Sequence, residues 1–156
     1  MQKKFIILII LIIVLSGCSK EKPSLNLNID GKVESINTEI IYTHKEALVF
    51  PAVVRSSGSK PVETEYKGIE LIKLFDSLNV DITSYSKVTF NASDGYRIIL
   101  SMEEIKEPSN VYLTFERDGE ILKSKKQGGN GPFQLIIRRD PFSQRWIKHV
   151  NEIILE

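Results

Sequence analysis

Residues 87–100, Lys-Val-Thr-Phe-Asn-Ala-Ser-Asp-Gly-Tyr-Arg-Ile-Ile-Leu, carry the pattern that decides the fold class. Alternating apolar side chains predict one short strand over 88–90 and a second over 96–100. The segment 91–95 is rich in turn-forming residues, and Gly95 can adopt the positive φ that a tight hairpin needs. A helical pattern before this hairpin and further strand patterns after it indicate an α+β domain.

The first residues have the layout of an export signal. Lys3 and Lys4 precede an unbroken apolar run over 5–15, which is too short for a spanning helix of about 20 residues. The next segment, Leu-Ser-Gly-Cys at 15–18, resembles the bacterial lipobox. This resemblance implies that residues 1–17 are a signal peptide. It also implies that Cys18, the one cysteine of the chain, becomes a lipidated N-terminus carrying acyl chains such as palmitate.

The expected mature protein is therefore lipid-anchored to the bacterial cell membrane and extracytoplasmic. Residues 18–24 would form a short tether, and residues 25–156 would form one globular domain. Removal of Lys3 and Lys4 leaves nineteen basic against twenty acidic residues. A chain with this balance has no overall basic field, so we expect the membrane as a partner and no nucleic acid.

Most of the domain has strand-like patterns. Apolar residues, alternating or continuous, predict strands over 25–29, 33–36, 49–55, 111–117, 121–122, 133–139 and 150–155. The clearest helix is expected over Gly68–Leu78, because Leu71, Leu74 and Phe75 share one face. Capping-box spacing predicts short helical turns that begin at Thr43 and at Ser101.

The residue types needed for common catalytic sites are sparse. His44 and His149 are the only histidines and lie about a hundred residues apart, without the spacing of a zinc or calcium site. Both are expected at the surface or in structural roles. The chain also lacks the Gly-x-Ser-x-Gly elbow of serine hydrolases.

Two features of the last third could bind an anion. The loop Gly128–Gly131 is either a phosphate-binding turn or a tight connection between strands. Basic residues are concentrated around it, and they could form a solvated face, an anion site, or a surface near phospholipid head groups. These residues are Lys123, Lys125, Lys126, Arg138, Arg139, Arg145 and Lys148.

The order of the motifs resembles a known family, the molybdopterin-binding domain of sulfite-oxidase-type oxidoreductases. The similar segments, which together cover about residues 25–156, are Asp30–Val33, Tyr66–Leu74, Val88–Tyr96, Asp118–Glu120, Gly128–Ile137 and Trp146–Ile153. This resemblance implies a compact fold of mainly short mixed strands with one main helix. In the family, that fold holds a molybdenum cofactor.

The chain departs from the family at the metal. Family enzymes bind molybdenum through a cysteine thiolate between the first strands and the helix, but residues 53–66 contain no cysteine. Gln127 or Gly128 also stands where family enzymes often have a histidine. We therefore expect no cofactor, with bound molybdopterin as the alternative.

Together these patterns favour a lipoprotein that binds a small anionic ligand or an envelope protein rather than catalysing a reaction. The alternatives are a molybdopterin-dependent oxidoreductase and an envelope structural protein. The expected ligand site combines the loop after β-strand 49–55, the 94–96 turn and the glycine loop. Its candidate residues are Arg55, Asp94, Tyr96, Gly128, Gly129, Asn130, Arg138 and Lys148.

Overall fold

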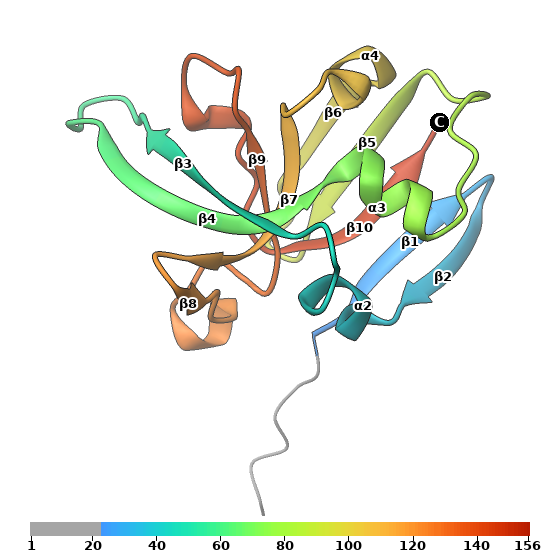
Figure 1. Ribbon diagram of the computed structural model, residues 1–156, viewed down its shortest axis with the longest axis horizontal. Helices are drawn as coiled ribbons and strands as arrows, with labels where there is room; N and C mark the ends of the chain where they lie inside the picture. The colour runs from blue at the N-terminus through green and yellow to red at the C-terminus, as the bar shows by residue number, and fades with distance from the viewer. Residues whose placement is uncertain (1–22) are drawn as a thin grey trace, which may run out of the picture.

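The computed structural model describes residues 23–156, so the expected signal peptide, Cys18 and most of the tether lie outside the described residues. Two five-stranded sheets form the domain (Figure 1). Within residues 23–156, none of the helices has the length and apolar character needed to cross a bilayer.

Sheet A has the order β2-β1-β10-β5-β6. Its strands are β1 (Leu25–Ile29), β2 (Lys32–Ile36), β5 (Lys87–Ala92), β6 (Arg97–Ser101) and β10 (Val150–Leu155). Sheet B has the order β3-β4-β7-β8, and β9 pairs with β7 beside β8. Its strands are β3 (Leu48–Val54), β4 (Val62–Glu70), β7 (Val111–Arg117), β8 (Glu120–Ile121) and β9 (Gln134–Ile137).

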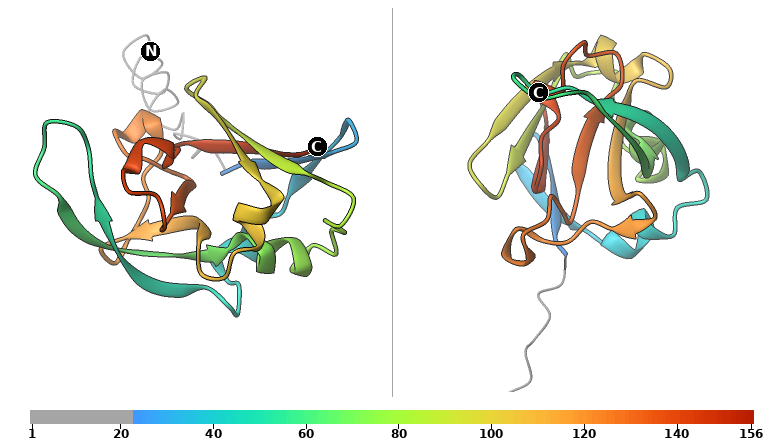
Figure 2. Two further views of the ribbon diagram at one scale, coloured as in Figure 1. Left: turned by 90° about the horizontal axis from the view of Figure 1, so that it is seen from above. Right: turned by 90° about the vertical axis from the view of Figure 1, so that its left-hand side faces the viewer.

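Short helical segments connect the strands. They are the α-helices α2 (Thr38–Tyr42), α3 (Leu71–Ser77) and α4 (Met102–Lys106), and the 3₁₀ turns η1 (Lys125–Gln127) and η2 (Ser143–Arg145). One continuous hydrophobic cluster takes side chains from both sheets and from α3, including Phe90, Leu113 and Phe75. The left-hand view of Figure 2 shows the β3–β4 hairpin extending away from this core.

The predicted hairpin is confirmed and lies within sheet A. β5 and β6 are antiparallel, with Phe90 opposite Ile98, and Gly95 has a φ of +90° in the turn. Tyr96 belongs to the turn rather than to the second strand, because β6 begins at Arg97. The second predicted capping box is also confirmed: the Ser101 hydroxyl accepts from the Glu104 N–H at 3.2 Å, and the Glu104 carboxylate accepts from the Ser101 N–H at 2.9 Å.

The predicted helix over Gly68–Leu78 begins three residues too early. Residues 68–70 continue β4 and pair with β7, placing Gly68 opposite Thr114. A Cβ on Gly68 would lie 2.4 Å from the Leu113 carbonyl oxygen, so glycine allows the two strands to approach. The helical face itself is confirmed, since Leu71, Leu74 and Phe75 are fully buried.

The helical turn predicted from Thr43 to about Leu48 is wrong in position. The helix lies before it, in α2, where the Asn37 side chain accepts from the Glu39 N–H at 3.1 Å and caps the N-terminus. Thr43 instead ends α2, and both its N–H and its hydroxyl donate to the Glu39 carbonyl. The longest strand of the structure, β4, had no predicted counterpart over residues 62–67.

Candidate anion-binding surface

Three of the candidate site residues are exposed cations that have no acidic partner among residues 23–156. They are Arg55, Arg138 and Lys148. Among residues 23–156, no carboxylate lies within 4.0 Å of their charged nitrogens. Their hydrogen-bond donors therefore face solvent and can meet an anion from outside.

Arg138 lies directly after β9 against an aromatic surface. Its guanidinium carbon is 5.3 Å from the ring centroid of Phe50, which in turn packs on Tyr112 with a centroid distance of 4.3 Å. A guanidinium over a ring is held by the ring's electron-rich face while its N–H groups stay free at the edge. The geometry therefore restrains Arg138 without using up its donors.

The turn η2 holds two other candidate residues. The Arg55 N–H donates to the Ser143 hydroxyl at 2.9 Å, and the Arg55 carbonyl accepts from the Ser143 N–H at 3.0 Å. The Tyr96 hydroxyl donates to the Gln144 carbonyl at 3.2 Å. The end of β3 and the β5–β6 turn, which are distant in sequence, therefore meet at η2.

Asp94 has a local role. Its carboxylate accepts from the Tyr96 N–H at 3.1 Å and so closes the turn of the hairpin. The neighbouring Ser93 N–H donates to the His149 carbonyl at 3.0 Å. His149 is buried, its N–H donates to the Asn130 carbonyl at 2.9 Å, and its Nδ1 lies 3.0 Å from the Gly131 carbonyl oxygen. This histidine thus connects the hairpin turn to the glycine loop.

The glycine loop is a tight connection that is closed by hydrogen bonds of its own backbone. The N–H groups of Gln127, Gly128, Gly129 and Gly131 all donate to carbonyls of residues 123–125. A Cβ on Gly129 would lie 2.2 Å from the Lys123 carbonyl oxygen. These donors are satisfied within the loop, so they cannot form a phosphate cradle in this conformation.

The glycine loop also lies apart from the exposed arginines. Gly128, Gly129 and Asn130 line a groove of about 420 Å³ together with the β7–β8 hairpin. Arg138 follows the opposite end of β9 and does not line this groove. The structure therefore brings Arg55 and Tyr96 together at η2, but it does not bring Arg138 to the glycine loop.

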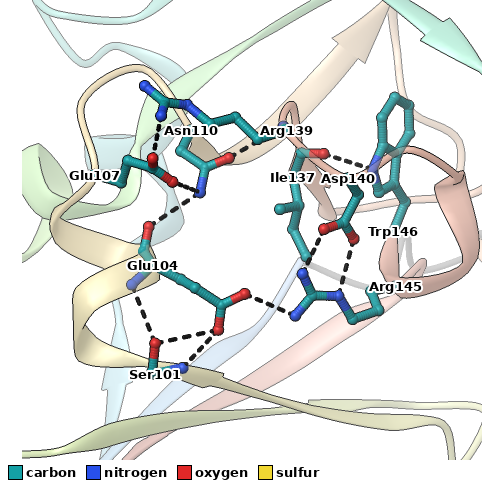
Figure 3. Close-up of polar contacts among 9 residues, drawn as sticks. All are labelled: Ser101, Glu104, Glu107, Asn110, Ile137, Arg139, Asp140, Arg145 and Trp146. Atoms are coloured by element: carbon teal, nitrogen blue, oxygen red, sulfur yellow. Dashed lines mark hydrogen bonds and ion pairs between the residues drawn. The ribbon is translucent and has the colours of Figure 1, made fainter.

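The other arginines of the region are neutralised, as Figure 3 shows. Arg145 pairs with both Glu104, at 2.8 Å, and Asp140, whose Oδ2 accepts from Nε at 2.9 Å. Arg139 forms an ion pair with Glu107. The buried Asn110 connects the two pairs: its amide donates to the Glu104 carbonyl at 3.2 Å and to the Glu107 carboxylate at 3.0 Å.

The hydrogen bonds of this network lower the pKa of one carboxyl group, that of Glu104. Partial burial of Glu104 favours its neutral form, but hydrogen bonds from the Ser101 backbone and from Arg145 outweigh burial and lower the pKa of Glu104. Glu104 is thus held as a carboxylate that fixes Arg145. Arg139 and Arg145 are thus held by carboxylates, whereas Arg138 contacts an aromatic ring.

A second cavity, of about 530 Å³, was not foreseen from the sequence. It lies between the β1–β2 hairpin and the segment after α3, with Leu27, Ile36 and Val80 in its apolar part. Glu34 and Asp81 line its polar part, and its lining contains no lysine or arginine. These carboxylates oppose the binding of an anion there.

The donor set does not fit a molybdenum centre of the thiolate type. Residues 23–156 contain no cysteine, and within them no three or more His, Asp or Glu side chains are grouped closely enough to hold a metal ion. The position between β3 and α3 therefore offers no soft ligand for molybdenum.

No protein-family profile matches this sequence, and no curated protein matches it. Among solved structures, the sulfane dehydrogenase SoxCD from Paracoccus pantotrophus superposes with a TM-score of 0.67 at 17% sequence identity. The superposition covers 90% of this chain and 40% of that one, so this chain spans less than half the length of that protein. The likeness confirms the predicted α+β fold of the sulfite-oxidase type.

Proposed function

We propose that this chain is a cell-envelope lipoprotein whose sulfite-oxidase-like domain binds a small oxyanion and holds no molybdenum through a protein thiolate. The observation that carries the proposal is the contrast among the basic residues around η2. Arg139 and Arg145 are paired with carboxylates, whereas Arg55, Arg138 and Lys148 are exposed without an acidic partner among residues 23–156.

Arginine suits an oxyanion because its planar guanidinium can donate two parallel hydrogen bonds. Arg138 is restrained over Phe50, so less side-chain freedom is lost when an anion binds. The site is open to water, and we therefore expect weak binding that decreases with ionic strength.

The first experiment measures binding of sulfate and of phosphate to the mature lipidated chain in detergent, by calorimetry at low ionic strength. The variant Arg55→Gln/Arg138→Gln/Lys148→Gln should lose most of the binding. The control Lys32→Gln/Lys45→Gln/Lys106→Gln removes the same charge from exposed positions elsewhere and should bind as the parent does. Equal loss in both variants, or none in either, would contradict the proposed site.

The second experiment tests the cofactor. We expect neither molybdenum nor pterin fluorescence in protein made by a host that synthesises molybdopterin. About one molybdenum and one pterin for each chain would overturn this part of the proposal and favour an oxidoreductase with an unusual metal site. Pterin without metal would indicate a carrier or sensor of the cofactor.

The third experiment tests the anchor. Lipidation at Cys18 predicts that Cys18→Ala leaves an uncleaved precursor without the mass of the acyl chains. Normal maturation of this variant would refute the assignment.

A further inference from the structure

The start of the described chain, a lysine loop and exposed isoleucines face the same end of the domain. Figure 1 and the right-hand view of Figure 2 place β8, η1 and α2 at the same end as the segment that leads into β1. The Thr38 hydroxyl of α2 contacts the Pro23 carbonyl at 3.5 Å. We call β8, η1 and α2 the η1 end.

Isolated apolar side chains are exposed at the η1 end. Ile121 of β8 is 53% exposed and Ile40 of α2 is 41% exposed. Lys123 and Lys125 are exposed beside β8, and no carboxylate of residues 23–156 pairs with them. Apolar side chains flanked by lysines are typical of surfaces that lie on a membrane.

Acidic side chains at this end only partly offset the lysines. Asp118 is neutralised by Arg117, with Nε and Oδ2 3.4 Å apart, and it also accepts from the Thr64 hydroxyl at 2.6 Å. Glu120 and Glu39 are exposed and remain as opposing charges. The β8–η1 segment, residues 120–127, therefore carries a net positive charge.

The loop presents its lysines from a fixed backbone. The Ser124 N–H and hydroxyl both lie 3.1 Å from the Gln127 side-chain oxygen, and the Gly131 N–H donates to the Lys123 carbonyl at 2.8 Å. Glycine at 129 allows the returning chain to lie against Lys123. The tight loop thus fixes the backbone from which the side chains of Lys123 and Lys125 project.

We infer that the η1 end docks on anionic phospholipid head groups, an inference that rests on the proposed lipidation of Cys18. Only four residues separate Cys18 from Pro23. Five backbone steps of at most about 3.5 Å keep Pro23 within roughly 17 Å of the lipidated residue. Lysines near an anionic leaflet are attracted over about one Debye length, roughly 8 Å at physiological salt. The short tether allows the η1 end to reach this range, and in the proposal the lysines then orient the domain.

The test uses the lipidated chain in vesicles that carry a nitroxide quencher at the head group. Because the lipid blocks Cys18, a fluorophore can be attached to a single introduced cysteine, at Glu120→Cys on the η1 end or at Ser57→Cys in the β3–β4 loop. The vesicles contain phosphatidylcholine alone or equal parts of phosphatidylcholine and phosphatidylglycerol.

A tether without docking predicts the same quenching in both kinds of vesicle. Docking predicts stronger quenching at position 120, and not at position 57, when phosphatidylglycerol is present. This increase should disappear in Lys123→Gln/Lys125→Gln and at about 1 M salt, where the Debye length is roughly 3 Å. It should persist in the control Lys60→Gln/Lys106→Gln.

The outcomes separate the two proposals. A protein without the acyl mass that leaves the vesicles refutes the lipid anchor. Three results with a lipidated protein would refute the docking. Quenching could be the same with and without phosphatidylglycerol. It could also increase with phosphatidylglycerol by the same amount at positions 120 and 57, or by the same amount in both double variants.

Discussion

Arg138 and Arg145 are separated by seven positions in the sequence and have opposite surroundings in the structure. Arg145 contacts two carboxylates, Glu104 of α4 and Asp140 of the segment before η2, and so ties α4 to η2. Arg138 has an aromatic ring beneath it and no acidic partner among the described residues. The difference teaches that a basic stretch can contain both structural and ligand-accessible cations, and that their partners distinguish them.

The largest effect on stability is expected when the ion pairs of Arg145 are removed. Arg145→Gln removes two charged contacts and leaves Asp140, whose side chain is 10% exposed, without its partner. Such contacts contribute about 1.5–3 kcal/mol each, and partial exposure of Arg145 reduces this, so we expect a loss of about 2 kcal/mol in the free energy of unfolding. Urea denaturation measures it. A loss no greater than that of Arg138→Gln would show that the ion pairs of Arg145 do not distinguish it from Arg138 in stability.

The next effect concerns the link between the two ion pairs. Asn110 is 2% exposed, and Asn110→Ala removes its bonds to Glu104, Glu107 and the Arg139 N–H. The loss of these part-buried hydrogen bonds should cost about 1–2 kcal/mol in the same assay. Asn26→Ala, on the outer face of β1, is the control and should change stability little. Similar values for both would show that the network is dispensable.

A smaller effect on stability should follow when the pH is lowered. The pKa of Glu104 is lowered in the folded state, so its stabilising contribution is present above its unfolded pKa of about 4.5 and is lost as pH falls through the folded pKa. The parent should therefore lose stability on acidification below about pH 4.5, and Arg145→Gln should lose less over that range. Parallel curves for the two proteins would show that Arg145 does not perturb Glu104.

The smallest effect on stability is expected when the exposed cations without an acidic partner among residues 23–156 are replaced. Arg138→Gln gives up one cation–π contact, worth about 0.5–1 kcal/mol at an exposed site. Arg55→Gln and Lys148→Gln should change stability by less than about 0.5 kcal/mol. Thermal unfolding without added anion checks this. A larger loss in Lys148→Gln would indicate a structural role that the contacts do not show.

Local signals in the sequence predicted the elements that local contacts stabilise. The hairpin at Gly95 and the capping box at Ser101 depend on residues a few positions apart, and both are confirmed. The same spacing failed at Thr43, because Asn37 offers an earlier cap. The start of α3 was misplaced because pairing of residues 68–70 with β7 overrides their helical pattern.

The candidate site was harder to predict, because the deciding partners are distant in sequence. Glu107 is 32 positions before Arg139, and Glu104 is 41 positions before Arg145. The basic cluster and the glycine loop were visible as residue types. Their division into paired and unpaired cations, and the internal bonding of the glycine loop, emerged only from the fold.

The place of β10 has a consequence for the order of assembly. β10 is parallel to β1 on one side and antiparallel to β5 on the other, so the β1–β2 hairpin and the β5–β6 hairpin touch in sheet A only through it. Each hairpin can form as soon as its own residues are available, but sheet A can close only when residues 150–155 arrive. If the chain is exported with its N-terminus leading, the two hairpins of sheet A stay unpaired with each other until β10, the last strand, has also crossed the membrane.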